Sequence, residues 1–172
     1  SRRQRQMCIR DSYYTDAYFM RSEEILNGDN YHPRVLMQVF ARDHVVVCGT
    51  DEVIALIRQC AFHPETIEIH SLRDGEEVDE WETVMTIEGD YADFAHLETI
   101  YLGILARQSR IATNVRRVVK AANGKPVLFF PARYDIYQTQ ESDGYAALVG
   151  GIHGFSTDAN ALAAGGRPAP CR

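Results

Sequence analysis

Arg133 is the side chain of this sequence best suited to bind an anion. It follows a short, wholly apolar run at residues 127–130, which is typical of a strand covered on both faces. In βα folds, functional residues lie just after the strands, and residues 131–135 occupy such a position. The planar guanidinium of Arg133 can pair bidentately with a carboxylate or a phosphate. A surface salt bridge is the alternative interpretation of this residue.

A glycine-rich segment is the second candidate for anion binding. Gly150, Gly151 and Gly154 precede Ser156 and Thr157, which stand just before a predicted helix. Backbone N–H groups at a helix N-terminus can cradle a phosphate. Glycines that only end a helix are commoner, so this segment alone is a weak signal.

The histidines and cysteines show no pattern of metal ligands. The six histidines are scattered, and His96 is expected to face solvent, away from the apolar side of its helix. Cys48, Cys60 and Cys171 have neither CxxC nor Cys/His spacing. The sequence therefore predicts no metal site, and free thiols in a reducing, cytoplasmic compartment.

The composition predicts a globular protein that binds neither nucleic acid nor a membrane. The chain has a net charge of −6, and 45% of its residues are hydrophobic. Residues 1–12 hold four arginines and one aspartate, so the rest of the chain carries a net charge of −9. An acidic surface of this kind repels phosphate backbones and anionic lipids. The sequence has no run of about 18 apolar residues, so no membrane span is predicted.

The first residues have an origin of their own. The string RRQRQMCIRDS, residues 2–12, matches residue for residue the translation of a transposase-type sequencing-library adapter. A basic arm for nucleic acid is the alternative. We interpret residues 1–12 as an adapter artefact of a metagenomic fragment, which leaves the native N-terminus unknown.

Residues 13–89 have the pattern of a small α+β domain. One helix is predicted to begin at Thr15 or Asp16, and another at Asp51, each at a residue that can cap a helix. The second helix ends near Cys60. Alternating or β-branched segments predict four strands, the first two of them neighbours, at residues 35–40, 44–48, 67–72 and 81–87.

Residues 90–124 predict a pair of consecutive helices. Asp90 is a suitable N-cap, and the helices are predicted to join near Gln108–Ser109, where the apolar pattern stops and restarts. Glu98 stands close to the buried stripe without an obvious partner. The stripe comprises Phe94, Leu97, Tyr101, Ile104 and Leu105, and continues with Ile111, Val115, Val118, Val119 and Ala122.

Residues 125–172 predict the first units of a βα barrel or a doubly wound sheet. The apolar strand at 127–130 is followed by a helix at 143–149, a short strand at Phe155–Ser156 and a helix capped by Asp158. A complete barrel needs about 250 residues. The fold class is therefore predicted as an α+β domain followed by the start of an irregular, truncated βα barrel.

Several segments together resemble the nicotinate phosphoribosyltransferase family, whose wider group includes the quinolinate and nicotinamide enzymes. They occur in the order and spacing of that family, and the LET-x-x-L-x-x-L…IAT string is the most specific of them. The resemblance implies an N-terminal α/β domain followed by an irregular βα barrel. The segments are TDAYF (15–19), VLMQVF…VVVCGTDEVI (35–54), EGDYADFAHLETIYLGILARQSRIAT (88–113), a strand ending in Arg133, and GGIHGFSTD (150–158).

The resemblance implies transfer of the phosphoribosyl group from phosphoribosyl pyrophosphate to nicotinate, which gives nicotinate mononucleotide and pyrophosphate in NAD biosynthesis. Mg²⁺ accompanies phosphoribosyl pyrophosphate, and many members couple the reaction to ATP hydrolysis. The implied partners are these small molecules and a second subunit, since the family site is shared in a homodimer.

The resemblance also implies roles for individual residues. Tyr18 would stack on the pyridine ring from the neighbouring subunit, and Phe130 would cover the other face. Arg133, followed by Tyr134, would meet the pyridine carboxylate or a phosphate. Glu98 and Thr113 match helix positions close to the family site. The residues beside the ring or ribose would be Gly154, Ser156, Thr157 and Asp158, and the catalytic candidates are Asp158 and Glu98.

Two departures from the family pattern leave alternatives open. Family members commonly have an aromatic-Gly-x-Arg string, whereas this chain has Pro131 after Phe130. The chain ends at residues 165–172 (GGRPAPCR), where relatives continue into a Gly-Thr-x-x-His segment. The expectation is an N-terminal fragment that is itself inactive. A quinolinate or nicotinamide enzyme and a non-catalytic binding module are the alternatives.

Overall fold

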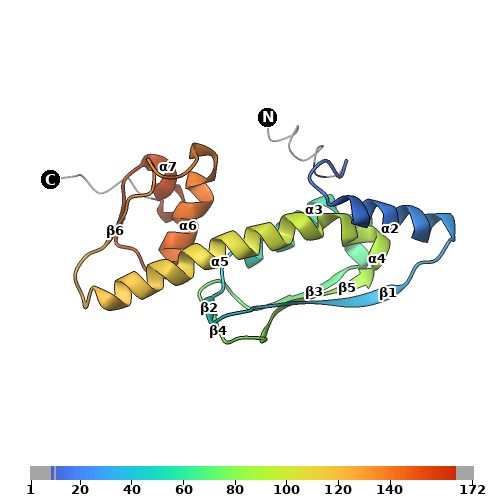
Figure 1. The fold of residues 1–172 in the computed structure, drawn as a ribbon, viewed down its shortest axis with the longest axis horizontal. Coiled ribbons are helices and arrows are strands. Elements are labelled where there is room, and N and C mark those ends of the chain that lie inside the picture. Colours follow the sequence, from blue (N-terminus) through green and yellow to red (C-terminus); the bar gives the residue numbers. More distant parts are fainter. Residues whose placement is uncertain (1–8, 10, 166–172) are drawn as a thin grey trace.

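One long helix, α5 (Glu98–Ala121), runs through the fold, and the other elements pack along it (Figure 1). The computed structural model describes residue 9 and residues 11–165. Figure 1 shows the strands β1, β3 and β5 beneath one half of α5, and the helices α6 and α7 against the other half. The proposed artefact at residues 1–12 therefore lies largely outside the described residues, as do residues 166–172.

The predicted break near Gln108–Ser109 is wrong, because α5 continues through it. The turn lies earlier, where Asp90 caps the short helix α4 (Tyr91–Phe94) through a 3.0 Å bond from Ala92 N, as predicted. The 3₁₀ turn η2 (Ala95–Leu97) then leads directly into α5. The apolar stripe of the first half is confirmed, since Phe94, Leu97, Tyr101 and Leu105 are buried.

Buried hydroxyl groups explain why the apolar pattern of α5 is interrupted without a break. Ser109 Oγ accepts a hydrogen bond from Cys48 N at 3.0 Å, and Thr113 Oγ1 accepts one from Val46 N at 2.9 Å. Thr113 Oγ1 in turn donates to Ser109 O at 2.6 Å. These helix side chains take the place that a neighbouring strand would have beside β2 (Val45–Val46). They are polar because the strand backbone requires partners.

The pairing predicted for the first two strands is wrong for the same reason. The strand β2 pairs antiparallel with β4 (Glu77–Val78), not with β1 (Arg34–Phe40). Its other edge is occupied by the α5 hydroxyls. The main sheet is antiparallel with the order β1-β5-β3, where β5 is Thr83–Asp90 and β3 is Glu68–Ser71. Three of the four predicted strands therefore belong to one sheet, and the fourth is held elsewhere.

The helix α3 (Thr50–Cys60) begins at a cap supplied by a distant residue. The N-cap position is Gly49, which has φ +98°, and not the predicted Asp51, which lies in the first turn. Asp74 accepts hydrogen bonds from Thr50 N at 2.9 Å and from Thr50 Oγ1 at 2.8 Å. It also accepts one from Tyr145 Oη at 2.8 Å, so one carboxylate joins the N-terminus of α3 to α6.

One helix, one 3₁₀ turn and a buried thiol complete the description of the N-terminal part. The helix α2 (Ala17–Gly28) buries Phe19, and η1 (Pro64–Thr66) connects α3 to the sheet. Cys48 is a free, buried thiol, and burial and the nearby Asp74 carboxylate raise its pKa to about 12. The thiol is therefore protonated near neutral pH.

No helix in the described part of the chain has the length and apolar character needed to cross a membrane.

The last part has the predicted order of strand, helix, strand and helix. The strands β6 (Leu128–Phe129) and β7 (Gly154–Phe155) are parallel and are joined through α6 (Gln140–Gly150). The helix α7 (Asp158–Ala161) follows, and the 3₁₀ turns are η3 (Tyr137–Thr139) and η4 (Leu162–Ala164). The expectation that both faces of β6 are covered is wrong within the described part of the chain, since Leu128 is 50% exposed there.

Glycines allow α6 to approach its neighbours closely. A Cβ at Gly144 would lie 2.0 Å from the carbonyl oxygen of Asn160, and a Cβ at Gly150 would lie 2.7 Å from the Cβ of Val115. The C-terminus of α6 is also held by Arg116 in α5, which donates to Gly150 O at 3.1 Å and to Val149 O at 2.9 Å. A guanidinium at this end of a helix satisfies terminal carbonyls and complements the helix dipole.

We expect Gly144→Ala to lower the free energy of unfolding by about 3 kcal/mol, because the methyl group would collide with the backbone of α7. Gly103→Ala is the matched control. Its Cβ meets nothing within 4 Å, and alanine should stabilise α5 by up to about 1 kcal/mol. Urea unfolding followed by circular dichroism measures both. Similar stabilities of the two variants would contradict the close contact between α6 and α7.

We expect Thr113→Val to lower the free energy of unfolding by about 1–3 kcal/mol, because it leaves the buried amide of Val46 without an acceptor. Thr99→Val in the same helix is the control. Its hydroxyl bonds to the exposed residue Asp16, where water can replace it. The same unfolding measurement applies, and a Thr113→Val protein as stable as the wild type would show that the strand does not depend on this hydroxyl.

Candidate functional site

The predicted anion-binding segments meet at one edge of the β6–β7 pair. Because the two strands are parallel, their carboxyl ends lie side by side, with Phe129 opposite Phe155. Residues 130–134 leave one strand, and residues 156–158 leave the other. A hydrogen bond of 3.1 Å from Ser156 N to Phe129 O ties the two exits together. The two segments therefore converge in the fold.

Arg133 lies exposed at this edge with its charge available. Its Cζ atom stands over the ring of Phe130, 5.7 Å from the centroid. No hydrogen bond or ion pair joins its guanidinium to another described residue, so the surface salt bridge considered for it is absent from the described part of the chain. Tyr134 is 93% exposed, and its backbone N closes a turn onto Pro131 O at 2.8 Å. The arrangement offers a cation and an aromatic face next to each other.

The second segment provides small polar groups. Gly154 is buried in β7, and Ser156 Oγ is buried without a hydrogen-bond partner among the described residues. Thr157 Oγ1 accepts from Asn160 N at 3.2 Å, which makes Thr157 the N-cap of α7. The predicted cap, Asp158, is instead the exposed first residue of that helix. Thr157 takes the cap because its extended backbone directs the hydroxyl back to the helix.

Two other predicted residues lie at the opposite end of the molecule. Tyr18 is 57% exposed, while its neighbour Phe19 is buried. The pKa of Tyr18 is raised mainly by partial burial and secondly by the negative charges of Asp16 and Glu98. The pKa of Glu98 is raised mainly by burial and secondly by the charge of Asp16. These groups form a cluster of aromatic and acidic side chains at the start of α5.

The start of α2 is anchored to this end of α5 by two threonines. Thr15 Oγ1 donates to His96 O at 2.6 Å, and Thr99 Oγ1 donates to Asp16 Oδ2 at 2.8 Å. Asp16 occupies the N-cap position of α2, but its side chain makes no cap hydrogen bond there. The prediction that His96 is solvated is wrong, because its ring is fully buried and stacks on Phe62 with centroids 4.6 Å apart. Burial lowers the pKa of His96.

Within one chain the two groups of residues do not meet. Glu98 and Thr113 are fifteen residues apart in α5, about 22 Å at 1.5 Å per residue. The β6–β7 edge packs against the C-terminal half of that helix through α6, whereas Tyr18 lies beside its N-terminus (Figure 1). Thr113 belongs to neither group, since both its hydrogen bonds hold the strand and the helix.

An ionic cluster that sequence reasoning missed connects α5 to the loop after β6. Arg107 Nε donates to Asp143 Oδ1 and Nη2 donates to Asp143 Oδ2, both at 2.9 Å. Arg107 Nη2 also donates to Asp135 and to Thr139 Oγ1. Hydrogen bonds to these carboxylates raise the pKa of Arg107. The hydrogen bond from Ile136 N is the larger cause that lowers the pKa of Asp135, and the hydrogen bond from Arg107 is the second. The signal in the sequence was Asp143, an acidic residue in a predicted helix, which requires a cationic partner because it is buried.

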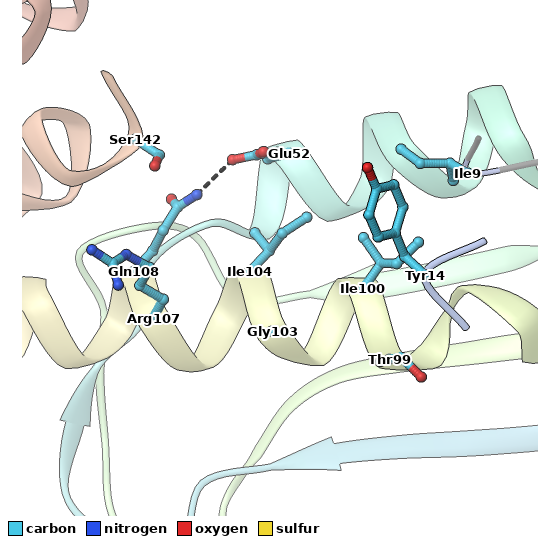
Figure 2. A pocket seen from close by; sticks show the side chains of 10 residues that line it. All are labelled: Ile9, Tyr14, Glu52, Thr99, Ile100, Gly103, Ile104, Arg107, Gln108 and Ser142. Carbon is cyan, nitrogen blue, oxygen red and sulfur yellow. Dashed lines mark hydrogen bonds between the residues drawn. The ribbon is translucent and has the colours of Figure 1, made fainter. Parts of the chain in front are cut away.

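A groove of about 500 Å³ runs along α5 between α3 and α6 (Figure 2). Ile100 and Ile104 form its floor, and Gln108 bonds to Glu52 across it. Figure 2 shows Arg107 at the end of the groove near Ser142. None of the predicted site residues lines it. No group of three or more histidine, cysteine or acidic side chains among residues 9 and 11–165 could hold a metal ion.

Comparisons with known proteins agree with this architecture. Among solved structures, the chain is similar to nicotinate-nucleotide pyrophosphorylase from Pyrococcus furiosus, with a TM-score of 0.79 and 32% identity over 91% of this chain and 40% of that one. At 18% identity, the enzyme of the same name from Francisella tularensis shares the fold, with a TM-score of 0.65 over 86% of this chain and 53% of that one. Human nicotinic acid phosphoribosyltransferase does so at 15% identity, with a TM-score of 0.74 over 87% and 37%.

The chain thus spans about two fifths to one half of the length of these relatives. No curated protein sequence matches it significantly. The family model described as "Quinolinate phosphoribosyl transferase, N-terminal domain" matches residues 16–109, which is more than half of the chain. This protein therefore belongs to the quinolinate phosphoribosyl transferase family, whose N-terminal domain it carries.

Proposed function

We propose that the chain is part of an enzyme that transfers the phosphoribosyl group from phosphoribosyl pyrophosphate to nicotinate, giving nicotinate mononucleotide and pyrophosphate for NAD synthesis. The observation that carries the proposal is the exposed guanidinium of Arg133, which lies over the ring of Phe130 at the β6–β7 edge. Family membership supports the reaction class. The geometry supports a planar acidic substrate.

The proposed base site uses both features of this edge. The pyridine ring of nicotinate stacks on Phe130, which is 48% exposed, and its carboxylate pairs with Arg133. A fixed carboxylate orients the ring nitrogen toward the ribose carbon, and positioning of this kind is a large part of catalysis in a group transfer. Tyr134 lies next to Arg133 and is free to close over the base.

The proposed ribose and phosphate contacts come from the segment after β7. Ser156 Oγ, which lacks a protein partner among the described residues, donates to a substrate oxygen. Gly154 is buried beside it in β7, and Thr157 holds the start of α7 in place. The exposed carboxylate of Asp158 stabilises positive charge as it develops on the ribose carbon.

The remaining predicted residues enter the proposal through a second subunit. Tyr18 and Glu98 lie beyond the reach of Arg133 in the same chain, so a homodimer in which they face the partner's β6–β7 edge is the arrangement we propose. Mg²⁺ belongs to the bound pyrophosphate substrate in this scheme. The described side chains form no metal-binding group of their own, and we assign no step to it. A contact of Thr113 with substrate stays a prediction.

Quinolinate is the second candidate substrate, and the family description favours it. Quinolinate carries two carboxylates and requires additional cations. Arg107, which binds the loop after β6, is already neutralised by Asp135 and Asp143. The charge count at this edge therefore favours nicotinate. A non-catalytic binding module remains the alternative from another class, and an activity assay separates it from both enzymes.

We expect the full-length protein that carries this sequence to form nicotinate mononucleotide, and Arg133→Ala to lower kcat/KM for nicotinate by at least about 100-fold, through loss of a bidentate pair. Arg117→Ala, which removes an exposed arginine of α5, should change it less than about twofold. Product formation from nicotinate, quinolinate and nicotinamide is measured with each protein.

A wild-type protein that converts only quinolinate would replace nicotinate by the second candidate. A protein that converts none of the three bases would leave a binding role. Full activity of Arg133→Ala would contradict the proposed base site.

A further inference from the structure

The loop between β6 and α6 carries Arg133, yet it buries little apolar surface. Tyr134, Ile136 and Tyr137 are 93%, 60% and 77% exposed. A loop with few buried contacts samples many conformations unless polar contacts restrain it. The position of Arg133 therefore depends on the polar contacts of this segment.

The main restraint outside the loop itself comes from Arg107 in α5. Its Nη2 atom donates to Asp135 Oδ2, while the other carboxylate oxygen of Asp135 accepts from Ile136 N at 2.8 Å. The same Nη2 atom donates to Thr139 Oγ1 at 3.1 Å. Both ends of the segment 135–139 are thus attached to one guanidinium.

Arg107 is itself held by a second, buried carboxylate, which makes the attachment effective. Asp143 accepts two hydrogen bonds from it at 2.9 Å, and the Asp143 side chain is only 2% exposed. Thr139 Oγ1 adds a 2.8 Å bond to Asp143 Oδ2. An arginine already fixed by a buried bidentate pair loses little conformational entropy when it binds a second carboxylate.

We propose that Arg107 and Asp135 are positioning residues, whose ion pair holds the β6–α6 loop so that Arg133 stands at the β6–β7 edge. The consequence for substrate binding rests on the proposed function, but the restraint on the loop does not. Arg107 thus has two roles: Asp143 binds it to α6 as part of the fold, and the bond from its Nη2 atom to Asp135 orients the site.

Hydrogen exchange measured by mass spectrometry on the 172-residue chain tests the restraint directly. In Asp135→Ala, exchange in peptides covering residues 130–139 should become about three- to fivefold faster, since both partners are about 40% exposed and the pair is partly screened. Glu141→Ala, which removes an exposed carboxylate from the first turn of α6, is the matched control and should leave the loop within about 1.5-fold.

The charge-reversed Asp135→Lys should accelerate exchange further, by about tenfold, because a lysine repels Arg107. The melting temperature should stay near that of the wild type in both variants, since the pair lies at the surface. Unchanged exchange in both variants would overturn the proposal. Faster exchange throughout the chain would also overturn it, because the pair would then be a general stabiliser.

Enzyme kinetics of the full-length protein provide the second readout. If the loop must be in place for nicotinate to bind, Asp135→Ala raises KM for nicotinate by the same factor as the exchange rate and leaves kcat within about twofold. Equal KM values in wild type and variant would overturn the positioning role. A wild-type protein that forms no mononucleotide contradicts the proposed function alone, and the exchange result still decides whether the loop is restrained.

Discussion

The architecture depends on hydrogen bonds between a helix and the backbone of a strand. The amides of Val46 and Cys48 are buried and have no strand beside them on that side. Thr113 and Ser109 supply the acceptors, so β2 is locked against the middle of α5. Because an unpaired buried amide is costly, this contact fixes both the position of the strand and the rotation of the helix.

The position of the candidate site follows from that rotation through α6. With α5 fixed, Arg107 and Arg116 face α6, one binding Asp143 near its N-terminus and the other its last carbonyls. Asp74, which also binds the N-terminus of α3, accepts a hydrogen bond from Tyr145 of α6. Gly144 then brings α7 into contact, and α6 connects β6 to β7. The edge that carries Arg133 is thus held by polar contacts that lead back to α5.

Sequence periodicity was sufficient where an element is defined by its own pattern. It predicted the strand at 35–40, a helix from Asp51 to about Cys60 and the order of the last two βα units, because alternation and helical spacing reflect which face is buried. It also placed residues 131–135 and 157–158 just after strands, at the face where the carboxyl ends of such strands meet. The apolar half of α5 was predicted for the same reason.

The failures share one cause, which is a partner distant in the chain. Ser109 was interpreted as a break in the helix because its partner, the backbone of Cys48, lies 61 positions away. The α3 cap is supplied by Asp74, 24 positions away. His96 is buried because Phe62 stacks on it, a contact that helical periodicity cannot reveal. Arg107 and Asp143 form the pair that sequence reasoning missed, 36 positions apart.

The central claim is that a pyridine carboxylate binds at the β6–β7 edge, and a crystal structure of the full-length protein with nicotinate mononucleotide tests it most directly. The account expects the carboxylate about 2.8 Å from the guanidinium of Arg133, with the pyridine ring stacked on Phe130. A carboxylate bound to other cations, with Arg133 still in solvent, would contradict the account.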